Sequence, residues 1–286
     1  MLAAILASGL AVGAVYALIG VTYNVMFSAS RVMSFTSGQL GMLGGVLGAM
    51  FIARLGLPSL LGLAATLACC AAVGVLTEIV AVRPVLKSLE QHLYVLSTLA
   101  LALMIQQVTA IEWSTEPQPF PRLFGIGDGG PTDEKFWLPL LACAVVVVGL
   151  ELLYRRTLVG RAFLAIAEDN FAARALGLPE RNLRMASYAL AGVIGGLAGF
   201  ASGQLLLAFF ANGSMLNFYG FVPVALGGMG NNRGAIASGL ALGVFQQAAN
   251  FLVGGVFASV AVFTVFIVVL LVAPQGLMGS PSVRRV

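Results

Sequence analysis

The chain has 286 residues, a mean hydropathy of +0.99 and only 9% charged residues. A soluble domain carries about 25% charged residues, so a water-soluble fold is excluded, and the length allows one polytopic transmembrane domain over 1–286. The net charge of +4 reflects where arginines sit relative to a membrane and does not indicate nucleic-acid binding. The three cysteines lie in apolar runs without metal-ligand spacing, which is typical of small buried side chains.

Eight apolar runs are long enough to cross a bilayer, which takes about 20 predominantly apolar residues. The predicted spans cover residues 2–27, 35–53, 58–82, 92–111, 137–154, 185–210, 234–253 and 257–273. A ninth run, 219–230 (YGFVPVALGGMG), is shorter and interrupted by proline and glycine. The first run has no basic segment before it, so we expect a retained span rather than a signal peptide. The predicted fold class is an all-α integral membrane bundle of about eight long transmembrane helices plus one short broken segment.

Arginine and lysine in the short loops predict the orientation. Segment 155–184 holds six arginines against three acids, whereas segment 112–136 holds five acids against one arginine and one lysine. We therefore expect 155–184 to be cytoplasmic and 112–136 to be an irregular external loop. Arg284 and Arg285 predict a cytoplasmic C-terminus, and counting back places the N-terminus outside. The topology then requires that 219–230 crosses, or nearly crosses, the membrane.

Glycines recur four residues apart along several spans, a spacing that lets helix backbones approach closely. The pairs are Gly41/Gly45, Gly44/Gly48, Gly192/Gly196, Gly195/Gly199 and Gly239/Gly243. We expect these faces to pack helix against helix; the alternative is that they line or hinge a pathway.

Motifs for catalysis and nucleotide binding are missing from the sequence. There is no GxxxxGK[ST] and no HExxH, and a single histidine argues against a histidine-based metal site or triad. GIGDGG (125–130) contains a pattern of intramembrane aspartyl proteases, but Asp128 falls in the predicted external loop and no predicted span contains an aspartate. We therefore do not expect an enzyme.

Two acids lie near span ends, each close to an arginine. Glu78 precedes Arg83 by five residues and Glu151 precedes Arg155 by four, so both are predicted to form interfacial ion pairs. A proton-coupled carrier normally keeps an acid or base at mid-membrane, where an ionisable group marks function. Its absence disfavours such a carrier.

Two polar stretches interrupt the apolar pattern: SFTSGQ (34–39), where the second span opens, and GGMGNNRG (227–234), after the short run. Non-helical backbone at membrane depth is tolerated only where protein buries it or where it lines a water-filled cavity. Paired broken segments in the two halves of a transporter point to a substrate path. The alternative is that both are turns at the membrane surface. The predicted path residues are Ser34, Thr36, Ser37, Gln39, Asn231 and Asn232.

The longest charged, helix-prone segment is RAFLAIAEDNFAARALGLPERNLR (161–184). Asp169 or Asn170 can cap the N-terminus of a short helix. Gly177 can terminate this helix, and Pro179 prevents it from continuing. The small residues of this helix are Ala172, Ala173 and Ala175. We expect them to form a low-relief surface that fits a groove on a partner; an amphipathic helix lying on the bilayer is the alternative.

Within this segment, AIAEDNFAARALGL resembles the cytoplasmic coupling loop of ABC importer permeases, with matching positions at Ala172, Ala173 and Gly177. A wider set of stretches resembles the branched-chain amino acid permeases of high-affinity uptake systems. These stretches are GRAFLAIAEDNFAARALGLPERNLRMASYALAGVIGGLAGF, GAVYAL (13–18), AVRPVL (81–86), VALGGMGNNRGAI (224–236) and VAPQGLMG (272–279). The resemblance covers essentially the whole chain, and the size resembles the shorter of that family's two permease types.

The resemblance implies a permease subunit of a binding-protein-dependent ABC importer, multi-pass in a bacterial inner (plasma) membrane. A second homologous permease subunit would complete a heterodimer, two ATPases carrying ATP and magnesium would dock on the coupling loops, and a periplasmic or lipid-anchored binding protein would deliver the solute. The chain itself would bind no cofactor. The implied coupling residues are Glu168, Asp169, Ala172, Ala173 and Gly177. The rival hypothesis is a self-sufficient secondary carrier or channel for a small polar solute.

Two departures from the family pattern bear on the solute and on coupling. The family commonly reads Asn-Phe-Ala-His-Gly-Glu where this chain has SFTSGQ (34–39), so a histidine and an acid are replaced by small or neutral groups. That leaves branched-chain amino acids, other amino acids, amides, urea and small acids open as solutes. The glutamate of the general coupling motif corresponds to Phe171, with the acid displaced to Glu168.

Overall fold

The structure, a computed structural model, describes residues 2–87, 93–113, 115–123, 133–273 and 276–278. Its helices are α1 (Leu2–Ser30), α2 (Ser37–Ala49), η1 (Met50–Arg54), α3 (Ser59–Thr77), η2 (Glu78–Val82), η3 (Val85–Lys87), α4 (Leu93–Glu112), α5 (Glu134–Arg156), α6 (Leu158–Glu168), α7 (Asn170–Ala175), α8 (Glu180–Leu206), α9 (Asn212–Gly227), α10 (Asn232–Val253) and α11 (Gly255–Val272). Asp128, Arg284 and Arg285, on which two sequence arguments rest, lie outside the described residues.

Seven helices of the described chain are long and apolar enough to cross a membrane: α1, α3 with η2, α4, α5, α8, α10 and α11. They coincide with seven of the eight predicted spans, so the all-α, multi-pass membrane fold is confirmed. The other predicted span, 35–53, is the 13-residue α2 continued by the five-residue π-helical turn η1. Between α4 and α5 the described backbone is largely irregular, with an isolated antiparallel bridge from Gln118 to Ala208.

The short apolar run is helical up to Gly227, and its proline does not interrupt the helix, whereas residues 228–230 are not helical. Helix α9 is continuous over 16 residues, contains Pro223 and starts at Asn212. The preceding span therefore ends earlier than predicted: α8 stops at Leu206 because Leu207 turns to φ +60°. The Asn212 side chain then donates to the carbonyl oxygens of Leu206 at 3.0 Å and Leu207 at 2.9 Å, which satisfies carbonyls that the helix end leaves unpaired.

Helix α9 carries the chain from one end of the bundle towards the other. It begins against the end of α8, and the turn after it reaches α1, where the Gly230 N–H donates to Asn24 Oδ1 at 2.9 Å. Its 16 residues span about 24 Å at 1.5 Å per residue, against about 30 Å of bilayer hydrocarbon. The helix is therefore shorter than the hydrocarbon layer is thick, and its crossing of the membrane stays a prediction.

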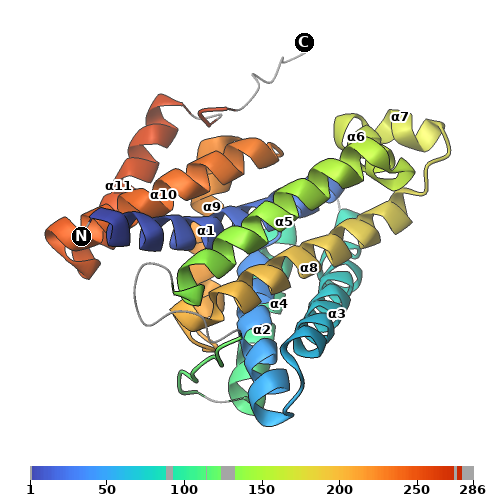
Figure 1. Ribbon diagram of the computed structural model, residues 1–286. Coiled ribbons are helices and arrows are strands. Elements are labelled where there is room, and N and C mark those ends of the chain that lie inside the picture. The colour runs from blue at the N-terminus through green and yellow to red at the C-terminus, as the bar shows by residue number, and fades with distance from the viewer. Residues whose placement is uncertain (1, 88–92, 114, 124–132, 274–275, 279–286) are drawn as a thin grey trace.

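The N-terminus and the loop of α6 and α7 lie at opposite ends of the bundle (Figure 1). Helix α1 ends at Ser30, and the guanidinium of the next residue, Arg31, donates to the carbonyl of Ala167 in α6. The segment after α11 returns to that same end, since Leu277 N–H donates to Leu226 O at 2.6 Å. The start of α1 and residues 276–278 therefore lie at opposite ends of the bundle, and which end faces the cytoplasm stays a prediction.

Helices α1 and α8 are the most deeply buried of the long helices, and α10 and α11 the least. Glycine faces make this close packing possible. A Cβ on Gly199 of α8 would overlap the carbonyl of Gly41 in α2, and one on Gly243 of α10 would overlap the backbone of Gly13 in α1. These approaches confirm helix packing as a role of the spaced glycines.

Candidate functional site: the coupling loop and two cavities

Helix α7 is a short helix closed at both ends, as the sequence predicts. Asp169 Oδ1 accepts hydrogen bonds from the N–H groups of Phe171 at 2.9 Å and Ala172 at 3.1 Å. Gly177 follows the helix at φ +79°, where its N–H donates to Arg174 O at 2.9 Å. An L-residue is strained at such a φ and glycine is not, so the glycine is the reason the chain can turn back here.

Ala173 does not face outward, contrary to the expectation of a low-relief alanine surface. It is 2% exposed and packs in a small core with Phe163, Ile166 and Leu183, which joins α7 to α6 and α8. A helix of under two turns is held in place by packing one of its faces against its neighbours. A small side chain such as alanine on that face allows the closest approach. Ala173 therefore positions the loop rather than contacting a partner.

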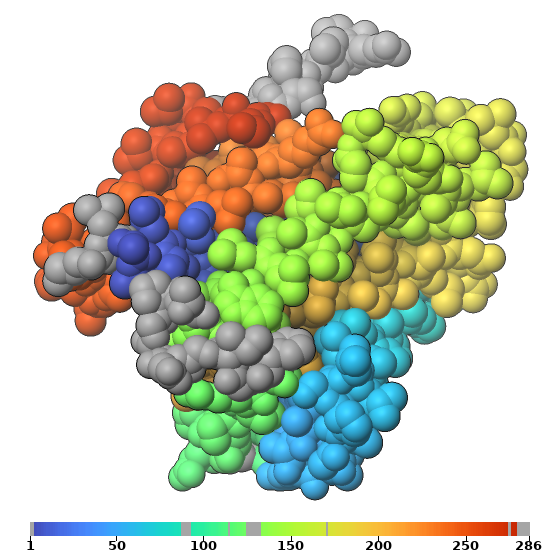
Figure 2. All heavy atoms as spheres, viewed as in Figure 1, coloured from blue at the N-terminus to red at the C-terminus, as the bar shows by residue number. Residues whose placement is uncertain are grey.

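The outer face of α7 is apolar and prominent. Phe171 and Leu176 are each 82% exposed, and Ala172 and Gly177 beside them are also exposed. Figure 2 shows α6 and α7 protruding at one corner of the molecule. The displaced acids of this loop, Glu168 and Asp169, are exposed as well. The loop thus presents two large apolar side chains on a rigid, capped helix.

Both predicted ion pairs are present, and one of them is buried within the protein. Arg155 Nε lies 2.6 Å from Glu151 Oε1 on an exposed surface. Arg83 lies 2.7 Å from Glu78, whose side chain is 0% exposed. Glu78 has a second partner that sequence spacing could not reveal, because Arg184 of α8 lies 2.9 Å away. This buried charge belongs to the same end of the bundle as the coupling loop.

The predicted broken stretch is real and lies inside the protein, not at its surface. Residues 32–34 have no regular structure, and Ser34, Thr36 and Ser37 are buried. The first turn of α2 packs at mid-length along α8, where Leu40 meets Gly195. Non-helical backbone at such depth requires hydrogen-bond partners from the protein.

Asn217 of α9 supplies two of those partners and also bonds α1. Its Oδ1 accepts from the Gly38 N–H at 2.7 Å and from the Tyr23 hydroxyl at 2.9 Å, and its Nδ2 donates to Phe35 O. The Phe35 N–H donates to Thr98 Oγ1 at 3.3 Å. One amide therefore binds the broken segment to both α1 and α9.

A cavity of about 480 Å³ opens at the start of α2, between α4, α9 and α11; we call it the amide cavity. Its walls are apolar apart from Gln39, Ser214 and Asn217. Gln39 Nε2 donates to Gln106 Oε1 at 3.4 Å, and the Ser214 hydroxyl donates to the same oxygen at 2.8 Å. The remaining lining residues are Phe35, Val95, Leu99, Ala102, Leu103, Phe218, Phe221, Val222, Phe263 and Phe266.

Of the four predicted path residues in this stretch, the structure places only Gln39 in the lining of the amide cavity. Ser34 and Thr36 bond each other, with their hydroxyl oxygens 2.8 Å apart, and Ser37 donates to Ser34 O at 3.3 Å. Sequence reasoning missed Gln106, Ser214 and Asn217. Gln106 is a polar side chain inside a predicted span, which was an available signal, whereas Ser214 and Asn217 fall between the predicted runs 185–210 and 219–230.

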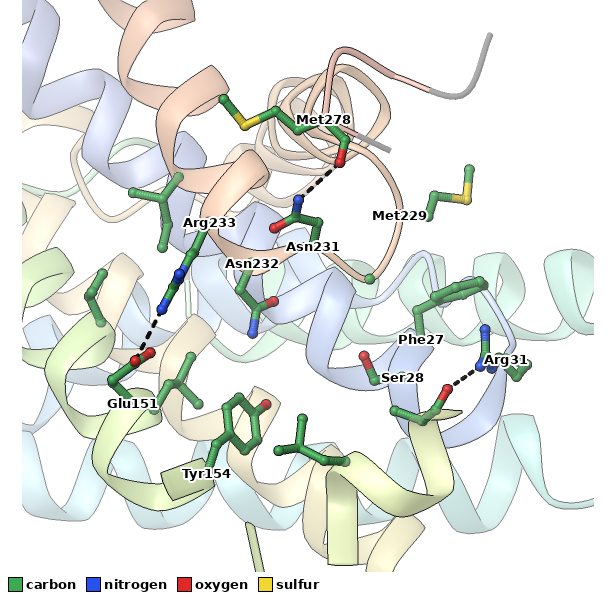
Figure 3. A pocket seen from close by; sticks show the side chains of 16 residues that line it. Phe27, Ser28, Arg31, Glu151, Tyr154, Met229, Asn231, Asn232, Arg233 and Met278 are labelled. Carbon is green, nitrogen blue, oxygen red and sulfur yellow. Dashed lines mark hydrogen bonds and ion pairs between the residues drawn. The ribbon is translucent and has the colours of Figure 1, made fainter. Parts of the chain in front are cut away.

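The second pair of predicted path residues lies elsewhere, in a cavity of about 510 Å³ beside the coupling loop (Figure 3); we call it the loop cavity. Asn231 caps α10 by accepting from Gly234 N–H at 3.1 Å, and its Nδ2 donates to Met278 O at 3.1 Å. Asn232 points towards Tyr154 and Ser28. The two asparagines thus adjoin α6 rather than the amide cavity, and Asn231 has a structural task of its own.

The sequence matches the family model "Branched-chain amino acid transport system / permease component" over residues 5–273. The chain belongs to this family. It is similar over 98% of its length to the high-affinity branched-chain amino acid transport system permease protein BraD of Pseudomonas aeruginosa, with 29% identity over 97% of that protein. The LivH protein of Escherichia coli K12, of the same description, is 27% identical over 98% of this chain and 96% of its own length.

A more distant similarity links this branched-chain permease to a second type of subunit. LivM of Escherichia coli K12 is 28% identical over 58% of this chain and 38% of its own length. Relatives of two permease types therefore exist within such transport systems, and this chain matches the LivH type from end to end. The chain is a multi-pass membrane permease component of the branched-chain amino acid ABC transporter family.

Proposed function

We propose that this chain is one of two permease subunits of a bacterial inner-membrane ABC importer, and that an ATPase docks on the outer face of α7. The observation that carries the proposal is the pair Phe171 and Leu176, each 82% exposed, on a helix capped at both ends. Large apolar side chains at the centre of an interface carry much of its binding energy. ATP and magnesium would bind the ATPase subunits, and this chain would hydrolyse nothing.

The rigidity of α7 supports docking over a loose membrane-surface helix. The helix is fixed from inside by Ala173 and its core, and Arg174 at its end pairs with Glu180 at 2.8 Å. A surface that is ordered before binding loses less conformational entropy when a partner arrives. A helix pressed by a moving ATPase must also pass force to the spans, which a fixed helix can do.

We further propose that the solute passes the amide cavity and carries an apolar side chain. None of the described residues that line this cavity is charged, and five of them are phenylalanines. Such a wall suits an aliphatic group, while the amides of Gln39 and Asn217 suit polar groups at one end. The relatives are named for branched-chain amino acids, which combine these features; a separate binding protein would deliver them.

The docking proposal is tested by uptake in proteoliposomes that hold this chain with its second permease, ATPase and binding-protein subunits. Leu176→Asp puts a charge on the outer face of α7, and we expect ATP-driven uptake of leucine to fall on the order of tenfold or more, as for an interface anchor. The matched control is Leu158→Asp, because Leu158 is 78% exposed but lies at the start of α6, away from α7. It should retain uptake.

Three results would count against the proposal. Equal uptake by the Leu176→Asp and wild-type assemblies would remove α7 as the docking surface. Uptake by this chain alone, without ATPase subunits or ATP, would identify a secondary carrier or channel instead. Competition by glutamine or urea but not by isoleucine or valine would remove the apolar solute from the proposal.

A further inference from the structure

Five alternately charged side chains form an unbroken series from the coupling helix to the end of α3; we call it the ion-pair relay. It begins at Arg174 of α7, whose Nε lies 2.8 Å from Glu180 Oε2. Glu180 Oε1 lies 3.0 Å from Arg184 Nη1 in α8. Arg184 Nε lies 2.9 Å from Glu78 Oε1, and Glu78 Oε2 lies 2.7 Å from Arg83 Nη2.

The relay runs from water into the protein. The side chains of Arg174, Glu180 and Arg184 are 66%, 17% and 10% exposed, and that of Glu78 is 0% exposed. A fully buried carboxylate is costly unless well-placed partners compensate its lost hydration, and removing one partner leaves an uncompensated charge. Separation from Arg184 would leave the buried Glu78 carboxylate with Arg83 alone of its two described arginine partners, so the Glu78–Arg184 contact favours one register of α3 and α8.

Glu78 stands where α3 changes shape. The α-helix ends at Thr77, and the π-helical turn η2 begins at Glu78, with the Arg83 N–H donating to Glu78 O at 2.8 Å. Single π-helical turns inside α-helices occur frequently at functional sites. Above this point α3 and α8 touch backbone to backbone, since Cβ atoms on Gly74 or Gly192 would overlap carbonyls of the other helix. The two helices thus form one packed pair with a charged clamp at its end.

The contacts that fasten α7 to that helix pair are of two kinds. The turn into α8, where the Leu178 N–H donates to Ala173 O at 3.1 Å, and the core around Ala173 are short-range and end at α6 and α8. The Arg174–Glu180 ion pair continues through the relay to α3. The relay therefore forms a path of charged contacts from α7 to α3.

We propose that Glu78 is a positioning residue that transmits displacement of the coupling helix α7 to α3. This inference rests on the proposed function, in which an ATPase docks on α7. Without the Glu78 charge, docking and ATP hydrolysis continue because the outer face of α7 is unchanged, but the spans no longer follow. The defect is a loss of coupling, measured as solute imported per ATP hydrolysed, rather than a loss of either partner.

The test measures leucine uptake and ATP hydrolysis in the same proteoliposomes, with the complete transporter. For Glu78→Gln we expect the import-to-hydrolysis ratio to fall at least about fivefold, the lower end of typical coupling effects. Glu78→Asp keeps the charge and should retain more of the ratio. Arg174→Gln changes the exposed outer end of the relay and should also lower the import-to-hydrolysis ratio. It provides the test if the Glu78→Gln protein does not fold and accumulate.

The matched control is Glu134→Gln, the same chemical change at an equally buried carboxylate. Glu134 is 0% exposed and lies at the start of α5, where it accepts from Gln204 Nε2 at 2.6 Å and the Leu123 N–H at 3.0 Å. It lies far from α7, so its variant should lower the amount of folded protein without changing the ratio.

The outcomes separate the two proposals. If Glu78→Gln and Arg174→Gln reduce uptake and hydrolysis by the same factor, or if Glu134→Gln lowers the ratio equally, the relay does not couple α7 to α3. If the wild-type assembly shows no ATP-dependent uptake, the proposed function itself fails. If wild-type uptake needs ATP, and only the relay variants import less solute per ATP hydrolysed, the inference stands.

Discussion

Two regions of this molecule hold backbone that leaves the regular helical path, and they use different chemistry to do so. At the coupling loop the groups are charged: Asp169 caps α7, and Arg174 pairs with Glu180. At the break before α2 they are neutral: Asn217 and Thr98 bond the backbone around Phe35. A charged group costs little free energy where water still reaches it. A neutral amide loses far less hydration free energy on burial than a charged group does, so it is the cheaper polar group inside the protein.

The contrast teaches that the kind of polar group follows the amount of water left around it. Glu78 is the exception, a charge at full burial that is held by two arginines. A buried ion pair is a weak source of stability compared with apolar packing. Its presence is better explained by a task that requires strong, directional contact between moving elements, such as the one proposed above.

The largest expected effect comes from removing the neutral amide at the break. Asn217→Leu leaves the Gly38 N–H, the Phe35 carbonyl and the Tyr23 hydroxyl without that partner. Each buried group left unpaired costs about 1–3 kcal/mol. We expect a large drop in the thermal unfolding midpoint in detergent, or no folded protein at all.

The control for this change is Asn250→Leu, because Asn250 is exposed and its side chain donates only to Gln247 among the described contacts. Its midpoint should stay close to that of the wild type. If the two variants unfolded at the same temperature, the break would not depend on Asn217, and the neutral half of the comparison would be lost.

A smaller effect is expected where α2, which starts at the break, packs on α8. Gly199→Ala adds a Cβ that overlaps the Gly41 carbonyl, and overpacking of this kind costs about 1–3 kcal/mol. Gly149→Ala is the matched variant, since no heavy atom lies within 4 Å of the added Cβ, and alanine favours a helix by up to about 1 kcal/mol over glycine. Unfolding midpoints of the two should shift in opposite directions; a shift of the same sign would contradict the close approach.

The smallest effect is expected at the charged cap of α7. Asp169→Ala removes the acceptor for the Phe171 and Ala172 amides, a loss of about 1 kcal/mol. Hydrogen exchange at those two amides should speed up on the order of fivefold, while the global unfolding midpoint stays unchanged. Asp169→Asn keeps an acceptor and should exchange more like the wild type. Unchanged exchange in Asp169→Ala would show that the cap does not hold the helix.

What could be read from the sequence was local. Span positions follow from runs of apolar residues, and the ends of α7 follow from Asp169 and Gly177, whose roles depend on the adjacent backbone alone. The glycine pairs along α2, α8 and α10 were recognised by spacing, and the structure confirms that they pack helices closely.

The sequence did not reveal which way individual side chains face in the folded protein. A helix that is apolar all round gives no periodic signal for its inner face, so the partner of Asn217 and the second partner of Glu78 were out of reach. Ala173 and Phe171 lie in one short helix, and only the placement of α6 and α8 decides that the first turns inward. The α8 boundary was missed because Leu207 makes the turn where glycine or proline would normally signal one.

Helix α1 contacts both α10 and the turn that precedes it, and these contacts have a consequence for how the protein is made. Asn24 lies fully buried in α1, and its Oδ1 is bonded by the Gly230 N–H, roughly 200 residues later in the chain. At about 5–20 residues per second, synthesis leaves the first span waiting roughly 10–40 s in the membrane with its glycine face uncovered. During that interval the Asn24 amide oxygen and the glycine face of α1 lack the partners that the folded chain gives them.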